Sequence, residues 1–341
     1  MATRGLGTGK LPPELLRSLV LGRLGAPRPE TLVPAAFGVD AAAIAVDTDW
    51  ACVLTCDPIT TATSGAGRLA VHVVCNDLAA MGAEPLGVLA TLLFPSGVDA
   101  AAIGELMADI DATARRLNVE VLGGHTEVAP GISAPLIVMS GVGKARRDRV
   151  LTAGGGRPGD VLVLTRAAAL EGTHVLAGDL GARLNSLGVP DSVLDEARAY
   201  GEELSVVAEA RLAVELGATA MHDPTEGGVL GAVWEMAEAS ERGFSVSVES
   251  IPVRGPTRAI CQALGVDPLR LIASGALLIA CPDAEALLRG LRHAGVEAAR
   301  IGTLTDAEGG RKLIHPDGRE ESIDSVSRDE LYRILEETSG R

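Results

Sequence analysis

The stretch that decides the fold is HVVCNDLAAMGAEP, at residues 72–85. Its valines, leucine and methionine recur at helical spacing, which predicts a helix with one face in the core. Gly82 ends this helix, and Pro85 prevents it from resuming. Asn76 and Asp77 stand inside the apolar run, although aspartate is a poor residue for the middle of a helix. The pattern therefore predicts a core helix whose polar pair has a task other than holding the helix together.

The composition is typical of a soluble globular protein with room for two domains. The 341 residues are 47% hydrophobic and 22% charged, and a domain of average size takes about 150 residues. The net charge of −15 argues against nucleic acid as a partner, because no basic stripe would neutralise its phosphates. The sequence contains neither a signal peptide nor an apolar run of membrane-spanning length. We therefore expect no nucleic-acid partner and no membrane association.

Cysteine usage indicates the cellular compartment. The five cysteines are an odd number, and none of them forms a CxxC pair. This usage fits reduced thiols that are buried as small hydrophobic residues, rather than a disulfide framework or a zinc site. We therefore expect a cytoplasmic protein.

The order of the expected elements indicates an α/β or α+β architecture in two halves. Strands and helices alternate up to a strand at about 134–145, and a second set begins with the strand VLVLT at 161–165. Between them lies RRDRVLTAGGGRPGD, residues 146–160, which is charged and then glycine-rich. We therefore expect domains at 1–155 and 156–341. Further strands are expected at 244–249, 275–282 and 312–316, and helices at 13–24, at 99–117 and after the loop HDPTEGGV at 222–229.

Four aspartates stand at the end of, or inside, apolar segments. They are Asp40 in FGVDAAAI, Asp57 in LTCDPIT, Asp77, and Asp223 in MHDPTEGGV. Buried carboxylates are costly unless they are paired, hydrogen-bonded or bound to metal. If the four converge, they form an oxygen-rich site suited to Mg²⁺ holding a polyphosphate. Each residue alone also has a structural explanation, since Asp40 and Asp57 can end strands and Asp223 can cap a helix.

Glycine-rich turns are a second and weaker signal for phosphate binding. A P-loop is excluded, because Arg4 stands where the first glycine belongs and Leu11 follows Lys10. No GxGxxG opens a convincing βαβ unit, so a nicotinamide or flavin fold is unsupported. The turns in question are GLGTGK (5–10), LGGHTE (122–127), AGGGRPGD (153–160) and TEGGVLG (225–231).

Histidine and cysteine offer weaker candidates. His125 and His222 are candidate ligands or bases, although a lone histidine at a strand end is more often structural. His72 lies on the opening helix, where we expect it to face the core or solvent. Cys75 is expected to be a packing residue, because nothing cationic nearby indicates a lowered thiol pKa. No GxSxG or other nucleophile arrangement is found in the sequence.

Taken in order, these motifs resemble the ATP-binding superfamily of aminoimidazole ribonucleotide (AIR) synthase, the PurM-like proteins. Its members include AIR synthase, selenophosphate synthetase, thiamine-monophosphate kinase and the hydrogenase maturation factor HypE. The most specific match is NDLAAMGAEP at 76–85, and ALEGTHVLA at 169–177 is similar to HypE-like members. The other matching motifs are GKLPPELL, GVDAAAI, CDPI, GGHTE, RPGDVLVLT and DPTEGGV.

The resemblance implies a PurM-like two-domain fold with ATP and Mg²⁺ as cofactors. The N-terminal domain would pair with its copy in a homodimer, so that strands of both chains form an intersubunit β-barrel, and the C-terminal domain would be α/β. Lys10 and the glycines before it would form an arm that closes over the phosphates. The implied metal or phosphate-site residues are Asp40, Asp57, Asp77 and Asp223, and the implied nucleotide contacts are Lys10, Asn76, Gly123, Gly124 and Thr126.

The sequence departs from the family's patterns at several places. It ends in EETSGR at 336–341, whereas HypE ends in an acceptor cysteine, and Ser274 stands where HypE commonly has a glutamate. His125 follows the two glycines where relatives often carry an acid, so either Glu127 takes a metal role or His125 contacts a different acceptor. Lys144 lies roughly where HypE places a functional lysine, although a surface lysine explains it equally well.

We therefore expect a Mg²⁺-ATP-dependent enzyme that phosphorylates an amide, carbamoyl or related oxygen, as a dehydratase or cyclo-ligase does. Its acceptor would be a small molecule or a partner protein, since no acceptor thiol is found near the end of this sequence. A role in metalloenzyme maturation, such as hydrogenase maturation, follows from the HypE-like motifs. Two alternatives stay open: a small-molecule kinase resembling thiamine-monophosphate kinase, and a non-catalytic ATP-binding maturation scaffold.

Overall fold

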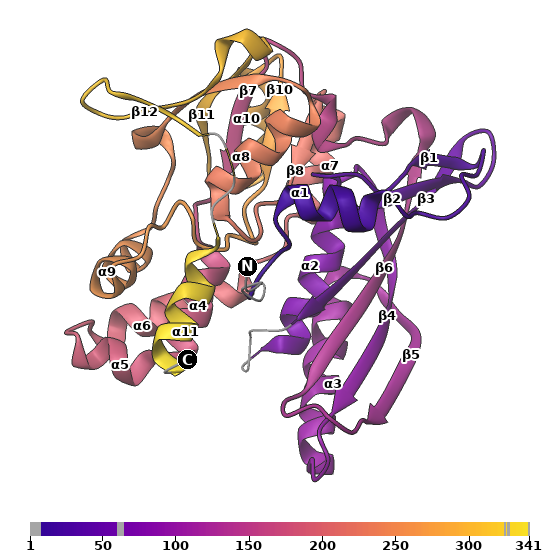
Figure 1. Cartoon of the computed structure of the whole chain (residues 1–341), viewed down its shortest axis with the longest axis vertical. Coiled ribbons are helices and arrows are strands. Elements are labelled where there is room, and N and C mark those ends of the chain that lie inside the picture. The colour runs from indigo at the N-terminus through magenta and orange to yellow at the C-terminus, as the bar shows by residue number, and fades with distance from the viewer. Residues whose placement is uncertain (1–7, 60–64, 324, 326–327, 340–341) are drawn as a thin grey trace, which may run out of the picture.

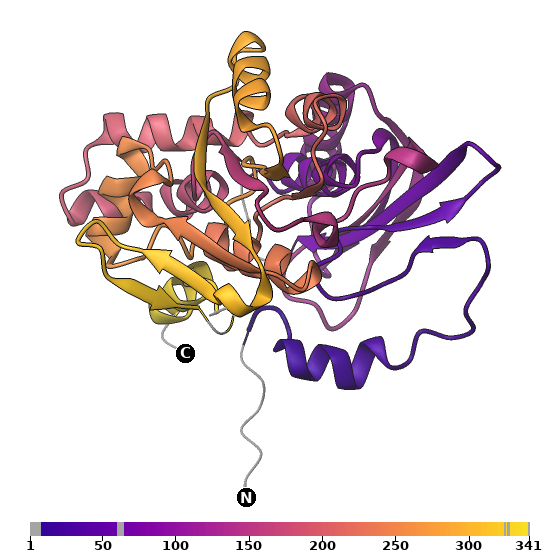
Figure 2. The same cartoon turned by 90° about the horizontal axis from the view of Figure 1, so that it is seen from above.

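The computed structural model describes residues 8–59, 65–323, 325 and 328–339. Within them the strands form two sheets with helices packed around them, so the expected mixed α/β architecture is confirmed (Figures 1 and 2). Among these residues no helix combines the length and the apolar composition that a membrane crossing requires.

The first sheet holds the strands of the N-terminal half in the order β1-β2-β3-β6-β4-β5. All neighbours are antiparallel except β4 and β5, which run parallel and leave β5 at an edge. The apolar segment at 41–60 predicts two strands joined by the turn DTDW, and these are β2 and β3. The strands are β1 (Thr31–Val33), β2 (Ala42–Ala45), β3 (Trp50–Ile59), β4 (Glu84–Phe94), β5 (Glu120–Val128) and β6 (Leu136–Arg146).

The helix expected at the polar pair is α2 (Ala66–Ala80), and it is buried on nearly all sides. It packs on β3, β6 and α3 (Ala100–Leu117), and it also contacts the second half of the chain (Figure 1). Gly82 follows α2 with φ 74°, and a Cβ there would lie 2.6 Å from the carbonyl oxygen of Arg149. Only glycine fits this turn. Gly82 thus ends α2 at a sharp turn that packs against the backbone at Arg149.

The face of the first sheet opposite α2 and α3, which we call the open face, carries exposed apolar side chains. Ile44, Trp50, Leu54 and Leu89 belong to it by strand alternation and register, and each is between 36% and 42% exposed. An antiparallel sheet with one face on the core normally presents polar residues on the other. The open face therefore differs from an ordinary solvated sheet surface.

The second sheet has the order β13-β12-β9-β11-β7-β10-β8 and is antiparallel except between β12 and β9. Its strands are β7 (Val161–Thr165), β8 (Ala220–His222), β9 (Gly243–Ser247), β10 (Leu278–Cys281), β11 (Ala298–Thr305), β12 (Arg311–Ile314) and β13 (Glu320–Ser322). The helices of this half are α4 (Leu170–Asp179), α5 (Gly181–Ser186), α6 (Asp191–Ala199), α7 (Val207–Glu215), α8 (Gly228–Ala239), α9 (Gly255–Leu264), α10 (Ala284–His293) and α11 (Glu330–Ser339).

The chain before the first sheet forms α1 (Pro13–Leu15) and the π-helical turn η1 (Leu16–Leu21), where the sequence predicts one helix at 13–24. Figure 2 shows this segment at the side of the molecule. The short 3₁₀ turns are η2 (Arg147–Arg149), η3 (Ala153–Gly155), η4 (Tyr200–Glu202), η5 (Val248–Ser250) and η6 (Ala307–Gly309).

The two halves share apolar packing through α2. Val71 and Cys75 lie in one core cluster with Tyr200 and Leu204 of the second half. The next turns of α2 contribute Ala79 and Ala80 to another cluster with β7, β8 and α7. Residues of α2 therefore have fixed positions relative to both sheets.

Candidate functional site

The four aspartates singled out in the sequence lie together where α2 meets the second half. Asp40 precedes β2, Asp57 lies near the end of β3, Asp77 is on α2, and Asp223 follows β8. Thr55 links three of them, because its Oγ1 donates to Asp77 Oδ2 at 2.6 Å and lies 3.1 Å from Asp57 Oδ2. The same oxygen is 3.2 Å from the backbone oxygen of Asp40. The structure thus brings together carboxylates from four separate segments.

A buried histidine extends this cluster toward α8. His222 Nδ1 lies 2.5 Å from Asp40 Oδ1, and its Nε2 lies 2.9 Å from Glu235 Oε2. Burial lowers the pKa of His222, but the two carboxylates more than offset this and hold it well above its usual value. Each ring nitrogen of His222 therefore faces a carboxylate, so the imidazole bridges Asp40 and Glu235.

Crowding of negative charge changes the acids themselves. Burial raises the pKa of Asp77 well above its usual value, and the charges of Asp223 and Asp57 raise it further. Burial also raises the pKa of Asp223 to about 7, and the charge of Asp40 adds to the effect. Without a cation the cluster therefore retains protons near neutral pH.

The donor set fits a hard divalent cation. Asp40 Oδ2 and Asp223 Oδ2 are buried and have no hydrogen-bond partner among the described residues. Ligand atoms of Asp40, His222 and Asp223 lie within 4.8 Å of one another. Because His222 is held by two carboxylates, the remaining donors are oxygens, which Mg²⁺ prefers. Such an ion would displace the retained protons and satisfy the orphaned oxygens.

Lys10 lies beside this cluster, held by the loop that follows β8. Its Nζ is 3.3 Å from Thr225 Oγ1 and 3.9 Å from Glu235 Oε1, and its backbone N–H donates to Glu226 Oε2 at 3.1 Å. The Lys10 side chain is about half exposed, and the charges of Glu235 and Glu226 outweigh its desolvation and raise its pKa above the usual value. Of the glycines expected in this arm, Gly5 and Gly7 lie outside the described residues.

Asn76 has a different position from the one expected. The resemblance implies that it supports Asp77 or contacts the nucleotide, whereas its side chain is fully buried and bonded to backbone groups of the second half. Its Nδ2 donates to Leu204 O at 2.8 Å, and its Oδ1 accepts from Val206 N at 2.9 Å. With both ends of the amide occupied, Asn76 joins the two halves. A nucleotide contact of Asn76 stays a prediction.

The residues expected on β5 lie away from the cluster within one chain. Gly124 is in register with Asp57 through β6 and β4, so three strand spacings of about 4.8 Å, roughly 14 Å, separate them. Gly124 approaches β4 so closely that a Cβ would lie 1.9 Å from Ala90 O. His125 Nε2 lies 2.9 Å from Glu127 Oε2. Both residues share this exposed edge of the sheet with Gly123 and Thr126.

Lys144 also lies apart from the four aspartates. Asp57 pairs with Met139 on β6, and Lys144 lies five residues further along that strand, which corresponds to about 17 Å at the usual strand rise. Its Nζ is 3.0 Å from Glu84 Oε2 and 6.0 Å from the centre of the Trp50 ring. Lys144 is therefore part of the open face.

Two other buried candidates are structural. Burial lowers the pKa of His72 to about 3 and raises the pKa of Cys75 to about 12. The imidazole is therefore neutral and the thiol is protonated at neutral pH. His72 faces the core, and Cys75 packs as a small hydrophobic residue, as the sequence predicts.

Reasoning from the sequence missed three polar residues of the site region. Thr55 stands two positions before Asp57 and so shares its face of β3, which period-two alternation would have indicated. Glu235 lies inside the apolar helix α8, a pattern similar to that of Asp77 on α2. Glu171, in the first turn of α4, is buried with an unpartnered Oε2, and its carboxyl interacts electrostatically with Asp223.

Glu171 predicts a measurable pH dependence of stability. Burial raises its pKa from 4.5 to about 7, so the folded protein holds a proton that the unfolded chain releases between these values. The free energy of unfolding must then fall as pH rises through this window. Glu171→Gln should match wild type near pH 5 and be more stable by about 2 to 3 kcal/mol near pH 8. Urea denaturation at both pH values measures this, and a pH-independent difference would contradict it.

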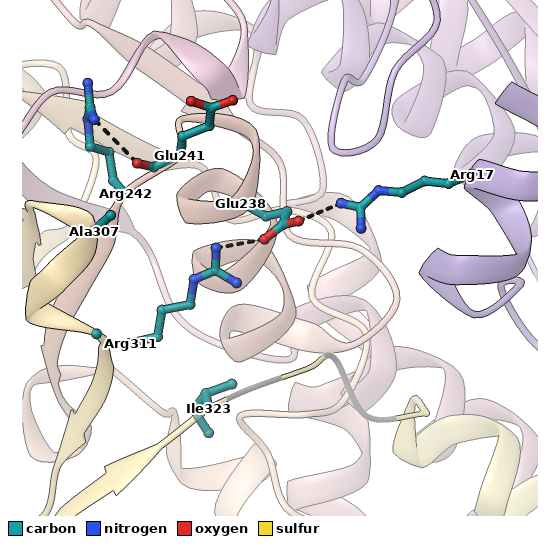
Figure 3. A pocket seen from close by; sticks show the side chains of 8 residues that line it. Arg17, Glu238, Glu241, Arg242, Ala307, Arg311 and Ile323 are labelled. Atoms are coloured by element: carbon teal, nitrogen blue, oxygen red, sulfur yellow. Dashed lines mark hydrogen bonds and ion pairs between the residues drawn. The ribbon is translucent and has the colours of Figure 1, made fainter. Parts of the chain in front are cut away.

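A hollow of about 640 Å³ lies on another side of α8, and it is not the acidic site. Figure 3 shows Arg17 and Arg311 pointing at Glu238 from opposite sides, while Arg242 turns toward the backbone of Glu241. The carboxylate of Glu238 thus joins η1 to α8 and β12. These ion pairs hold the N-terminal segment against the second half.

The sequence matches two family models. Residues 38–145 match the N-terminal domain of AIR synthase related protein, and residues 157–314 match its C-terminal domain. A putative hydrogenase expression/formation protein of Methanocaldococcus jannaschii is 30% identical over 314 residues, which cover 87% of this chain and 88% of that protein. The carbamoyl dehydratase HypE of Azotobacter vinelandii is 32% identical over 275 residues, covering 79% and 78%.

Solved structures of low sequence identity share the fold. The hydrogenase maturation protein HypE in complex with ATP superposes with a TM-score of 0.69 at 24% identity, over 94% of this chain and 96% of that one. HypE in a HypE–HypF complex gives a TM-score of 0.71 at 19% identity, over 91% and 99%. The two-sheet architecture is accordingly the PurM-like two-domain fold.

Proposed function

The chain belongs to the AIR synthase related family, and from this premise we propose that it is an ATP-dependent enzyme that phosphorylates an amide, carbamoyl or related oxygen. The two relatives described above, a carbamoyl dehydratase and a hydrogenase expression/formation protein, support this chemistry and a role in hydrogenase maturation. The ATP complex of HypE, which has the same fold, supports ATP as the phosphoryl donor.

The observation that carries the proposal is the convergence of four carboxylates with two buried, unpartnered oxygens. Asp40, Asp57, Asp77 and Asp223 would hold Mg²⁺. When bound, that ion neutralises charge on the phosphates and fixes their position, which supplies much of the catalysis of phosphoryl transfer. Thr55 and His222 keep the carboxylates oriented for this role.

We further propose a homodimer in which two open faces meet in an intersubunit barrel. The exposed Ile44, Trp50, Leu54 and Leu89 support this, because apolar side chains in such number on one sheet face favour contact with another apolar surface. A second copy would also place β5 at the active site of its partner and would enclose Lys144. The β5 residues near the nucleotide would then be Gly123, Gly124, His125, Thr126 and Glu127.

Leu89→Glu should shift the mass in solution from dimer to monomer.

We also propose that the chain divides at 155/156, as the separate strand sets of the two sheets suggest, and that it works in the cytoplasm, in keeping with five free cysteines. A protein partner that carries the acceptor is supported by the HypE–HypF complex. The acceptor would then be a carbamoyl or amide group presented by that partner or by a small molecule.

The test is an acceptor screen with the full chain, ATP and Mg²⁺, in which ADP and free phosphate are measured together. We expect ADP and phosphate in equal amounts only when an amide or carbamoyl acceptor is added. ADP with a phosphorylated product and no free phosphate would instead identify a kinase. Tight ATP binding with no turnover on any acceptor would identify a scaffold, and either result would overturn the proposal.

A further inference from the structure

His222 turns one ring nitrogen to a carboxylate of α8 and the other to the aspartate cluster. Its Nε2 is hydrogen-bonded to Glu235 Oε2 at 2.9 Å. Its Nδ1 lies 2.5 Å from Asp40 Oδ1, but this contact lacks the alignment of a hydrogen bond, and Nδ1 has no hydrogen-bond partner among the described residues. The residue is 4% exposed, so bulk solvent does not supply the missing partner. Nδ1 is therefore a buried nitrogen with an unfilled position beside the aspartates.

Two carboxylate oxygens beside Nδ1 share this situation. Asp40 Oδ2 and Asp223 Oδ2 are buried and likewise have no hydrogen-bond partner in the described part of the chain. Ligand atoms of Asp40, His222 and Asp223 lie within 4.8 Å of one another. Ligands held at about 2.1 Å from one ion are separated by up to about 4.2 Å, so a small inward movement would bring all three onto a single cation.

Glu235 holds the imidazole in the way that a metal-binding histidine is usually held. A histidine that binds metal through one ring nitrogen almost always donates the N–H of the other to a carboxylate, a carbonyl or water. Glu235 is a buried residue of α8 and is the partner of Nε2. When Nε2 donates its proton to this hydrogen bond, the lone pair of Nδ1 is left for an ion. The ring is also fixed from the main chain, because β8 pairs His222 with Leu278 of β10.

We propose that Asp40, His222 Nδ1 and Asp223 bind a divalent transition-metal ion, such as Mn²⁺, Fe²⁺ or Zn²⁺, and that His222 makes this site prefer such an ion to Mg²⁺. Mg²⁺ takes oxygen ligands, whereas imidazole nitrogen suits transition metals. The ion binds the neutral imidazole and so takes the place of a proton at Nδ1. The inference rests on the proposed function only for the use of the ion, since three protein ligands would leave positions open for phosphate oxygens.

The test titrates the full chain with Mn²⁺ alone, follows the free ion by electron paramagnetic resonance, and records the pulsed spectrum of the bound ion. The wild-type spectrum should show the coupling of a directly bound imidazole nitrogen. Mg²⁺ should displace this ion only at concentrations more than about tenfold higher. His222→Gln should abolish the nitrogen coupling and weaken Mn²⁺ binding by about tenfold or more, while Mg²⁺ affinity, measured by competition, should change by less than about threefold.

Two further variants separate metal binding from packing. Glu235→Gln keeps the imidazole but alters the group that orients it, so it should weaken Mn²⁺ binding about tenfold and retain the nitrogen coupling. His315→Gln is the matched control, because His315 also pairs with a glutamate, Glu321, but follows β12, near the opposite edge of the second sheet from β8. This variant should bind Mn²⁺ as wild type does.

The inference would be overturned by a wild-type spectrum without nitrogen coupling, or by an equal loss of Mn²⁺ and Mg²⁺ affinity in His222→Gln. The first of these results needs no variant, so a substitution that fails to fold cannot hide it. If Mn²⁺ binds with the nitrogen coupling but no acceptor supports ATP turnover, the proposed function fails while the metal site stands.

Discussion

Replacing Asp77 by asparagine is expected to remove Mg²⁺-dependent nucleotide binding while leaving the fold intact or more stable. Asparagine keeps the shape of the side chain and its hydrogen bond to Thr55. It replaces a carboxyl group whose pKa is already raised by burial and by the charges of Asp223 and Asp57, so the metal-free protein gives up no stabilising charge. The ion, however, loses a ligand and a compensating charge, which should weaken Mg²⁺–nucleotide binding by about a hundredfold or more.

Calorimetric titration with Mg²⁺ and a non-hydrolysable ATP analogue measures the loss, and thermal unfolding without metal measures stability. Asp111→Asn is the matched control, because it makes the same substitution at an exposed ion pair with Arg115 on α3. That variant should bind like wild type. Unchanged nucleotide affinity in Asp77→Asn would refute the role given to the cluster.

The neighbouring substitution Asn76→Ala should have the opposite profile, with a large loss of stability. It leaves Leu204 O and Val206 N buried without their partner. An unsatisfied buried backbone group costs roughly 1 to 3 kcal/mol, so the free energy of unfolding should fall by about 3 kcal/mol. Urea denaturation checks the magnitude. Asn185→Ala, which removes an exposed amide bonded to Asp191, should change stability by less than about 0.5 kcal/mol.

Adjacent residues of one helix thus have separate tasks, and the sequence indicated only one of them. The aspartate was identifiable because a carboxylate inside an apolar helix needs a partner, and the same criterion applied to α8 would have identified Glu235. The task of Asn76 was not readable, because it depends on a loop at residues 204–206, far along the chain. Nothing in the local pattern around either segment indicates that they meet.

The helices and strands were predictable where the apolar pattern is long. They were less predictable where a segment becomes a strand only because it pairs with a neighbouring strand in the fold. Strands β3, β6 and β7 and helices α2 and α3 follow directly from periodicity and end signals. Strands β8 and β11 were not expected, since β8 has only three residues and β11 (AARIGTLT) lacks a regular apolar alternation. They form in the sheet because β7 and β10 offer them partners. Tertiary pairing overrides a weak local preference in both cases.

The alanines at the end of α2 set how closely the two halves approach. Ala79 and Ala80 are almost fully buried and pack in one cluster with Val163, Met221 and other residues of the second half. The distance between Asp77 on α2 and Asp223 after β8 is consequently set by the small methyl side chains of these two alanines. A bulkier residue at position 80 would therefore push α2 away from β7 and β8. The distance between Asp77 and Asp223 would then increase, although neither carboxylate had been replaced.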